Sequence, residues 1–375
     1  MKVLHLISGG DSGGAKTHVF SLLGELKNHI DVKIICLIPG IFYQEILDKS
    51  IPVELFEQKH RYDLSVVKKI AALIVEEKYE LVHAHGARAN FIASILKRHI
   101  RVPMVTTVHS DYLLDFDGGF YRRLVYTGLN MLSLKYMDYY IAVSESFREM
   151  LVSRGYLPDK IFTVYNGIDF DAEVSACSRE QFLMANGINS KENEVLIGII
   201  GRLDKVKGHE VFIKAAAEVV AKVPNTRFLL AGDGSEKEGL MQLAKQLGVQ
   251  DKVIFLGFID RIYDFINAID INTLTSYSES FPYVLLEGAR LHKPTVSSAV
   301  GGIPDLIKDG QNGYLFKSAD YLEMAQKLLM LVEDSTLRKE LGQKLYERAK
   351  ESFSNKSLAR RHIEIYGQIL RRHDS

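Results

Sequence analysis

With 375 residues, 47% of them hydrophobic, the chain exceeds the size at which one hydrophobic core stops growing, so two domains are expected. Its 47 basic residues balance its 47 acidic residues, which excludes an overall field for nucleic acid and requires any anion to be held locally. Two cysteines, and no apolar run near the roughly 20 residues that cross a bilayer, fit a cytoplasmic protein without disulfides.

The first half alternates short β-branched apolar runs with amphipathic stretches. The apolar runs predict strands at 3–7, 32–38, 81–85, 104–108 and 140–143. The amphipathic stretches between them predict helices at 16–27, 64–77 and 88–98. This βαβ pattern indicates a parallel sheet with helices on both faces.

The pattern restarts after a polar stretch at 169–193. Further strands are predicted at 194–200, 227–230, 253–255, 269–273 and 295–297, with a helix at 210–220. An amphipathic helix at 356–372 is expected to cross back and pack on the first half. We therefore predict two doubly wound, Rossmann-like domains, residues 1–168 with 354–375 and residues 169–353, with the ligand in a central cleft at the carboxyl ends of the strands.

Each half opens with a strand, a loop and a helix. In the first loop, Gly13-Gly14 allows close approach of a ligand to the backbone and to a helix N-terminus, although tight turns also need glycine for steric reasons. In the second loop, Arg202 and Lys207 could neutralise a diphosphate without a metal ion. The alternative is that Arg202 pairs with Asp204 at the surface while the lysines are solvated. Neither loop has the Gly-x-Gly-x-x-Gly spacing of a dinucleotide oxidoreductase.

The densest group of polar residues lies around Glu279 and Glu287. Pro282 suits the first turn of a helix, with Ser280 or Phe281 near its cap, which places Glu279 in the loop and Glu287 in the second turn. Glu279 could then reach a sugar beside the diphosphate, and Glu287 could accept hydrogen bonds from ribose hydroxyls. Two solvated acids at a helix end are the alternative.

An ordered set of motifs resembles the retaining glycosyltransferases of family 4 (GT4), which have the GT-B fold. The resemblance spans nearly the whole chain and rests on Gly13-Gly14-Ala15-Lys16-Thr17-His18, Thr107-Val108-His109, Tyr165-Asn166-Gly167-Ile168-Asp169, Gly201-Arg202-Leu203, Lys207-Gly208, the pair Glu279 and Glu287, Gly301-Gly302-Ile303-Pro304-Asp305 and Asn312-Gly313.

The resemblance implies a role for each matching residue. Catalysis is assigned to Glu279, near the anomeric carbon, to His109, which contacts the transferred sugar, and to the diphosphate-binding pair Arg202 and Lys207. The donor-binding residues implied are Gly13, Gly14, Arg202, Lys207, Phe258, Glu279, Ser280, Phe281 and Glu287. The acceptor-binding residues implied are His85, Arg88 and Asn166.

The same resemblance implies the reaction. We expect retaining, metal-independent transfer of a hexosyl or N-acetylhexosaminyl group from a nucleotide-diphosphate sugar, a UDP-sugar in the first instance, to a hydroxyl of a glycan or lipid-linked acceptor. Such transfer serves polysaccharide or cell-surface glycan biosynthesis. No cofactor and no metal is expected, since the nucleotide sugar is a co-substrate. The alternatives are a nucleotide-sugar epimerase of the same fold and an inactive partner subunit.

Three other features have two interpretations each. The triplets Asp115-Phe116-Asp117 and Asp169-Phe170-Asp171 resemble a metal-binding signature but lack its strand context. His83 and His85 lie on one strand face and could form a zinc site with His109, but a buried, hydrogen-bonded His83 and an acceptor-facing His85 are favoured. The aromatic segment 120–137 could contact the inner face of the membrane peripherally, but a helix packed on the first sheet is favoured.

Overall fold

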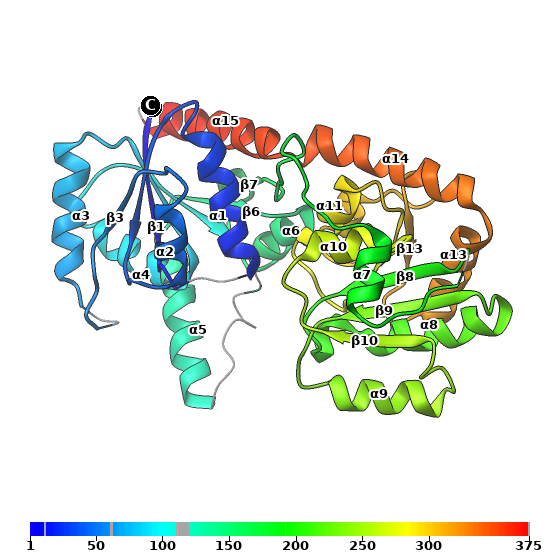
Figure 1. Ribbon diagram of the computed structural model, residues 1–375. Helices are drawn as coiled ribbons and strands as arrows, with labels where there is room; N and C mark the ends of the chain where they lie inside the picture. Colours follow the sequence, from blue (N-terminus) through cyan, green and yellow to red (C-terminus); the bar gives the residue numbers. More distant parts are fainter. Residues whose placement is uncertain (11–12, 61–62, 110, 112–119, 192, 374–375) are drawn as a thin grey trace. The chain divides into compact units, whose positions relative to one another are not determined.

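The computed structural model describes residues 1–10, 13–60, 63–109, 111, 120–191 and 193–373, apart from the side chains of residues 120–127. Its contacts separate the chain into two units (Figure 1). Unit 1 contains Met1–Asp169 together with Ser354–Ser375, and unit 2 contains Phe170–Phe353. The chain therefore leaves unit 1 once, passes through unit 2 and returns to unit 1 with its last helix.

Unit 1 is built on a parallel sheet whose described strands follow the order β3-β2-β1-β4-β5-β6-β7. The strands are β1 Lys2–Ile7, β2 Asp31–Cys36, β3 Val53–Leu55, β4 Leu81–His85, β5 Met104–Val108, β6 Tyr139–Ala142 and β7 Ile161–Thr163. Strands β1 to β3 follow one another across the sheet in one direction, and strands β4 to β7 follow one another in the opposite direction. The carboxyl ends of β1 and β4 therefore flank the topological switch point, where ligands bind in folds of this kind.

Helices cover both faces of this sheet (Figure 1). They are α1 Gly13–Leu26, α2 Ile41–Leu47, α3 Ser65–Glu76, α4 Gly86–Leu96, α5 Phe120–Lys135, α6 Glu145–Ser153, the short 3-10 helix η1 Pro158–Lys160 and α15 Asn355–His373. Helices α1, α2 and α15 share one core with Val3 and Ile7. Helices α3, α4 and α6 share the other with Leu4 and Leu6. Because β1 is covered on both faces, it is buried at every position after Lys2.

Unit 2 repeats this architecture around a parallel sheet whose described strands follow the order β10-β9-β8-β11-β12-β13. The strands are β8 Val195–Ile200, β9 Thr226–Ala231, β10 Val253–Gly257, β11 Ile271–Leu274, β12 Thr295–Ser298 and β13 Tyr314–Phe316. Its switch point lies between the neighbouring strands β8 and β11.

The helices of unit 2 again form two layers. They are α7 Arg179–Ala185, the 3-10 helix η2 Lys205–Lys207, α8 His209–Lys222, α9 Lys237–Gln246, α10 Ile262–Ala268, α11 Tyr283–Arg290, α12 Ile303–Leu306, α13 Tyr321–Glu333 and α14 Ser335–Ser352. Helices α8, α9, α13 and α14 bury apolar side chains against one face of the sheet. Helices α7 and α10 bury theirs against the other face.

The predicted α/β class with two Rossmann-like units is confirmed, and each predicted strand and helix is present with ends shifted by a few residues. Strands β3, β7 and β13 are not predicted from the sequence, because each has only three residues and lies at a sheet edge. Helix α7 lies inside the polar stretch that looked irregular. A capping box reveals it, since the Ser178 hydroxyl accepts from the Gln181 N–H and the Gln181 side chain accepts from the Ser178 N–H.

The aromatic segment at 120–137 forms α5, which lies against α4 (Figure 1). Leu134 is buried in the core beneath it, as the packed-helix interpretation requires. Met131 and Leu132 are exposed. Arg122 and Arg123, on which the membrane interpretation depended, have side chains outside the described part of the chain.

Candidate functional site

The loops after β8 and β11 meet at the carboxyl edge of the unit 2 sheet. The Thr275 hydroxyl donates to the Lys207 carbonyl at 2.9 Å, and the Tyr277 N–H donates to the Val206 carbonyl at 2.8 Å. These bonds tie the loop after β11 to the loop after β8. The predicted donor loop therefore lies at the switch point of this unit.

The Lys207 ammonium and the Glu279 carboxylate form an ion pair, with Nζ 2.6 Å from Oε1. The Ser276 hydroxyl donates to the same oxygen at 2.5 Å. The Glu279 side chain is only 10% exposed and that of Lys207 is 22% exposed, so both charges are largely removed from water. The structure thus joins two residues singled out 72 positions apart in the sequence. It adds Ser276, which no sequence motif marked.

Two glycines let these loops approach one another. Gly208 has φ +60°, and a Cβ there would lie 2.5 Å from the Thr275 carbonyl oxygen. Gly301, in the loop after β12, has φ +56°, and a Cβ there would overlap the Glu279 carbonyl oxygen. Because both the left-handed backbone and the close approach require glycine, these residues fix the position of the loop that carries Glu279.

Arg202 extends from the end of β8 with its side chain 81% exposed, and it pairs with Asp204 at 3.2 Å. This is the surface pair that the alternative interpretation described. An exposed ion pair contributes little free energy, so an arriving phosphate could replace Asp204 as the partner of Arg202 at small cost. The pair is therefore compatible with either interpretation of Arg202.

Helix α11 begins at Tyr283, and Pro282 is its N-cap with extended backbone (φ −78°, ψ 126°). The sequence predicts Pro282 in the first turn, with Ser280 or Phe281 near the cap. Pro282 is instead the cap itself, so this prediction is wrong by one position. The Ser280 carbonyl accepts from the Gly302 N–H at 3.0 Å, which holds this segment as a loop.

Glu287 lies in the second turn of α11, as predicted. Burial raises the pKa of its carboxyl group to about 7, against an opposing effect of the nearby Arg290 charge. Among the described residues, the Tyr283 hydroxyl is buried with no hydrogen-bond partner. Burial first, then the Glu287 charge, raises the pKa of Tyr283 well above its ordinary value. The two side chains therefore share a poorly hydrated environment.

The remaining predicted donor residues differ in accessibility. Phe258 follows β10 with its side chain 77% exposed. Phe281 is buried and stacks on Phe353 with ring centroids 5.1 Å apart, so its side chain packs the core and only its backbone is available to a ligand. Gly13 and Gly14 are the first two residues of α1, which begins three positions earlier than predicted. Their N–H groups lie at a helix N-terminus.

In unit 1, His109 follows β5 and is partly buried, and its Nε2 atom is buried with no hydrogen-bond partner in the part of the chain that the structure describes. His85, expected to face an acceptor, is instead buried, with Nε2 3.0 Å from Nδ1 of His5. Asn166 is buried as well, with Oδ1 2.9 Å from Nδ1 of His18. Arg88 is half-buried and donates to Gln58 at 3.3 Å. Two of the three acceptor candidates thus face the interior.

His83 is buried and hydrogen-bonded, as the favoured interpretation predicted. Its Nδ1 lies 2.6 Å from the Tyr366 hydroxyl and its Nε2 lies 2.8 Å from the Thr107 hydroxyl. Burial, with a smaller effect of neighbouring imidazoles, lowers the pKa of His83, His85 and His109 well below their ordinary value. These rings are therefore neutral at physiological pH.

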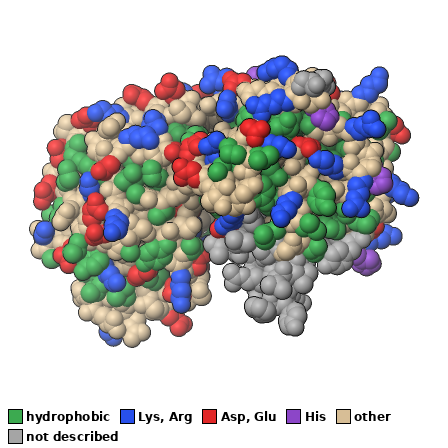
Figure 2. Space-filling view, turned by 180° about the vertical axis from the view of Figure 1, so that it is seen from behind, with side chains coloured by type: hydrophobic (Ala, Val, Ile, Leu, Met, Phe, Trp, Pro, Cys, Tyr) green, Lys and Arg blue, Asp and Glu red, His purple; other side chains and the backbone are tan. Residues whose placement is uncertain are grey.

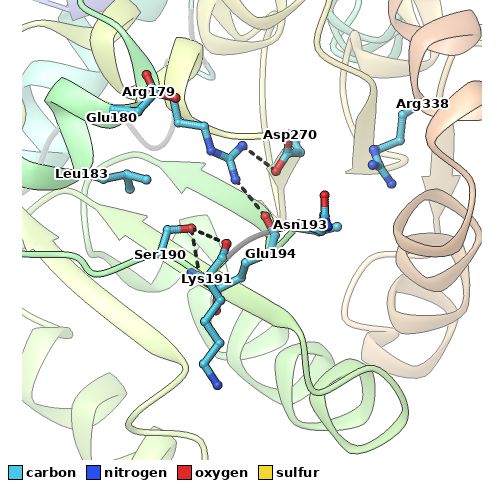
Figure 3. Close-up of a pocket in the computed structure, with 10 residues that line it drawn as sticks. Arg179, Glu180, Leu183, Ser190, Lys191, Asn193, Glu194, Asp270 and Arg338 are labelled. Carbon is cyan, nitrogen blue, oxygen red and sulfur yellow. Dashed lines mark hydrogen bonds and ion pairs between the residues drawn. The ribbon is translucent and has the colours of Figure 1, made fainter.

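A pocket of about 490 Å³ lies at the opposite edge of the unit 2 sheet (Figure 3). Val195 and Asp270, which line it, stand at the amino ends of β8 and β11. In this pocket the Arg179 guanidinium donates to the Asp270 carboxylate and to the Glu194 carbonyl, each at 2.8 Å. Since these charges already have partners and the pocket lies away from the carboxyl ends of the strands, it is not the candidate donor site.

The surface charges follow the balanced composition. On the face shown in Figure 2, basic and acidic side chains occur in both units, so this face does not resemble a nucleic-acid surface.

Of the two Asp-x-Asp triplets, Asp115-Phe116-Asp117 lies outside the described residues. In the second, Phe170 is buried and Asp171 pairs with Lys350 at 3.0 Å.

Two doubly wound units, one with a cation–carboxylate pair at its switch point, define a two-domain Rossmann-like protein suited to a nucleotide ligand. Profiles of known families agree with this class. "Glycosyltransferase Family 4" matches residues 12–172, and "Glycosyl transferases group 1" matches residues 181–350.

Among characterised proteins, N-acetyl-alpha-D-glucosaminyl L-malate synthase of Bacillus anthracis is 30% identical over 341 residues, which are 89% of this chain and 85% of that protein. The Campylobacter jejuni alpha-1,4-N-acetyl-D-galactosaminyltransferase named for the acceptor GalNAc-alpha-(1->4)-GalNAc-alpha-(1->3)-diNAcBac-PP-undecaprenol is 30% identical over 94% of both chains. The crystal structure of HepE from Anabaena in complex with UDP superposes with a TM-score of 0.82 at 23% identity, over 98% of this chain and 100% of that one. The chain belongs to the GT4 family of glycosyltransferases and has the GT-B fold. None of its described helices is long and apolar enough to cross a membrane.

Proposed function

We propose that this glycosyltransferase moves a hexosyl or N-acetylhexosaminyl group from a UDP-sugar to a hydroxyl of a glycan or lipid-linked acceptor, with retention of anomeric configuration and without a metal. The observation that carries the proposal is the Lys207–Glu279 ion pair at the switch point of unit 2. The similarity to HepE, crystallised with UDP, supports the choice of nucleotide. The similarity to the Campylobacter jejuni enzyme supports a glycan or lipid-linked acceptor, hence polysaccharide or cell-surface glycan biosynthesis.

The ion pair suggests how the donor is received. In the proposed complex the diphosphate takes over the ammonium of Lys207, the residue before the N-cap Gly208 of α8, whose N-terminus favours an anion. Glu279 is then released toward the sugar, still held by the Ser276 hydroxyl. Arg202 provides the second cation when it leaves Asp204. Glu287 accepts hydrogen bonds from the ribose hydroxyls.

The proposed chemistry demands stabilisation of charge on the leaving phosphate. As the glycosidic bond to the diphosphate breaks, negative charge builds on the phosphate and positive charge on the anomeric carbon. Lys207, Arg202 and the α8 N-terminus stabilise the first, and the Glu279 carboxylate stabilises the second. The acceptor oxygen bonds to the anomeric carbon from the face that the diphosphate leaves, which gives retention, and the leaving phosphate takes the proton of the acceptor hydroxyl. His109 contacts the transferred sugar.

The test is steady-state transfer with a panel of UDP- and GDP-sugars, the donor being chosen first by thermal shift because a ligand of the folded state raises its stability. We expect Glu279→Gln and Lys207→Ala each to lower kcat/KM at least about 100-fold, the loss typical of a removed electrostatic group. Lys205→Ala is the matched control, since Lys205 is exposed in the same loop. Near-normal turnover in both variants would refute the site.

The same assay separates the alternatives. Nuclear magnetic resonance of the product gives the configuration at the anomeric carbon, and an inverted product would overturn retention. Unchanged rates in the presence of EDTA are expected for metal-independent transfer. Isomerised donor without dependence on an acceptor would identify an epimerase instead.

We propose that a lipid-linked acceptor also brings peripheral contact with the inner face of the membrane. The exposed Met131 and Leu132 of α5 support this contact, because apolar side chains at a lipid surface are transferred out of water. Leu132→Glu should reduce co-sedimentation with vesicles of anionic phospholipid. Equal co-sedimentation of the variant and the unaltered protein would remove the membrane contact from the proposal.

A further inference from the structure

Six of the twelve histidines of the chain gather in one buried cluster of unit 1. We call it the histidine cluster; its members are His5, His18, His83, His85, His109 and His362. They come from the neighbouring strands β1 and β4, from the residue that follows β5, and from the two helices α1 and α15 on the same face of the sheet. The cluster lies at the switch point between β1 and β4, where His5 is in register with His83.

In several of these rings, only one of the two nitrogens has a hydrogen bond among the described residues. Among the described residues, one buried ring nitrogen has no hydrogen-bond partner in each of His5, His18, His85, His109 and His362. His83 differs, because both of its nitrogens bond to hydroxyl groups. A buried nitrogen without a partner costs free energy, so five such nitrogens in one cluster require an explanation.

Three of the rings can converge on a single point. Each of His18, His85 and His109 can offer one ring nitrogen so that the three atoms lie within 4.8 Å of one another. The unpartnered nitrogens of these residues are Nε2 of His18, Nδ1 of His85 and Nε2 of His109. Tetrahedral zinc with Zn–N bonds near 2.0–2.1 Å needs such atoms about 3.3 Å apart, so zinc binding would require the three rings to turn toward one another.

The other nitrogen of two of these rings is already oriented. Nδ1 of His18 lies 2.9 Å from Oδ1 of Asn166, an acceptor that directs its proton there and leaves Nε2 with a lone pair. Nε2 of His85 lies 3.0 Å from Nδ1 of His5, which can accept its proton and leave Nδ1 of His85 with a lone pair. Outer hydrogen bonds of this kind orient the imidazole ligands of metal ions.

A second group of three, His5, His83 and His85, also satisfies the distance criterion. It is the weaker site, because metal binding there would break both hydrogen bonds of His83 and the bond between His5 and His85. The group of His18, His85 and His109 keeps all of these bonds when its unpartnered nitrogens are the metal ligands.

We propose that His18, His85 and His109 bind one divalent transition-metal ion of the zinc type, with water as a fourth ligand, and that the bound ion inhibits the enzyme by holding His109. Three neutral imidazoles suit zinc, copper or nickel better than magnesium or calcium, which prefer oxygen. Its residues differ from those of the donor site proposed in unit 2. Its inhibitory effect, unlike the binding itself, rests on the proposed role of His109 in transfer.

Binding is tested on the full-length protein after removal of metals with EDTA. Zinc competition against a chromogenic chelator, and cobalt titration followed by visible absorption, report affinity and geometry without any activity assay. We expect one zinc per chain, a cobalt spectrum of tetrahedral type and, with zinc, a higher melting temperature. His18→Gln and His109→Gln should each weaken zinc binding at least about 30-fold, since each removes one of three ligands.

Two control variants separate ligand loss from general damage. His362→Gln alters the same cluster outside the group of three, and His99→Gln alters an exposed histidine. Both should bind zinc with an affinity within about threefold of the unaltered protein, with folding checked by circular dichroism. Absence of saturable one-to-one binding in the unaltered protein, or unchanged affinity in both ligand variants, would overturn the site.

The inhibitory effect is tested by titrating zinc into the transfer reaction. Activity should fall with a midpoint equal to the zinc dissociation constant and return with EDTA, and His18→Gln should resist inhibition over that range. If zinc binds with the expected stoichiometry but leaves transfer unchanged, the metal site stands, while the inhibition and the proposed role of His109 are wrong. If Glu279→Gln and Lys207→Ala remain active, the donor site is wrong without consequence for zinc binding.

Discussion

Lys207 and Glu279 form a largely buried ion pair. Such a pair gains Coulomb energy but loses hydration, so its net stabilisation is small. In the proposed donor complex, exchange of the carboxylate for a diphosphate would therefore replace one set of charge-assisted bonds by a stronger one at little cost to the fold.

At the scale of single residues, Glu287 makes stability depend on pH. Burial raises the pKa of its carboxyl group to about 7, above the ordinary value of 4.5. Between these values the folded state binds more protons than the unfolded state, so the free energy of unfolding falls as pH rises from about 5 to 8. Glu287→Gln should abolish this fall, which we expect to be on the order of 2 kcal/mol.

The measurement is urea unfolding of the variant and the unaltered protein at pH 5.5 and pH 8.5. Other titrating groups contribute to both proteins, so the difference between them isolates Glu287. Glu340→Gln is the control, because the Glu340 side chain is 54% exposed. A difference that does not change between the two pH values would show that Glu287 is not buried in the manner described.

At the scale of elements, the positions of the loops depend on a few glycines. Gly301→Ala places a Cβ against the Glu279 carbonyl in a backbone conformation that alanine tolerates poorly. We expect a loss of about 2–4 kcal/mol in the free energy of unfolding, the range of strained or overpacked substitutions. We also expect a fall in kcat/KM for the donor, because the loop carrying Glu279 must move.

Gly239 offers the matched control for this substitution. It lies within α9, and a Cβ there would meet no atom within 4 Å. Gly239→Ala should therefore be neutral or stabilising by up to about 1 kcal/mol. Chemical denaturation and transfer kinetics of the two alanine variants decide the matter: equal stability and equal activity would contradict the packing of Gly301 on the Glu279 loop.

The elements themselves follow from local sequence to a large extent. Strands such as β4 and β5 have the predicted ends because their apolar residues are continuous and both faces are covered. Edge strands of three residues carry too few side chains to produce a pattern, and α7 has too short a helical segment to show a clear period. The N-cap position of Pro282 depends on the bond between Ser280 and Gly302, which joins distant segments.

The residues proposed for the site can be chosen from the sequence, but the side chains that contact them in the structure cannot. Arg202, Lys207 and Glu279 carry chemistry that the sequence displays, whereas the bond from Ser276 to Glu279 depends on loop geometry. The histidine cluster shows the same limit. The spacing of His83 and His85 places both on one face of β4, but the contribution of His5 requires the register of β1 against β4. That of His362 requires the return of α15 to unit 1.

At the scale of the whole molecule, unit 1 includes the last helix of the chain, whereas unit 2 is complete without it. Unit 2 is one continuous segment with its own sheet and two cores. Unit 1 is completed only by α15, which buries Leu358, Ile365 and Tyr366 against the sheet. Full burial of each such side chain is worth about 1.5–3 kcal/mol, so losing three approaches the whole stability of a typical domain.

Residues 170–353 expressed alone should therefore fold cooperatively, because they contain every strand of the unit 2 sheet together with Arg202, Lys207, Glu279 and Glu287. If the proposed donor site lies within this unit, the fragment should bind UDP with an affinity within about tenfold of the full chain, yet it should not transfer sugar. Residues 1–169 without α15 should lack a cooperative unfolding transition.

Circular dichroism in urea and calorimetric titration with UDP test both fragments. A folded 1–169 fragment would show that α15 is dispensable to unit 1, and a folded 170–353 fragment that ignores UDP would place essential donor contacts outside unit 2.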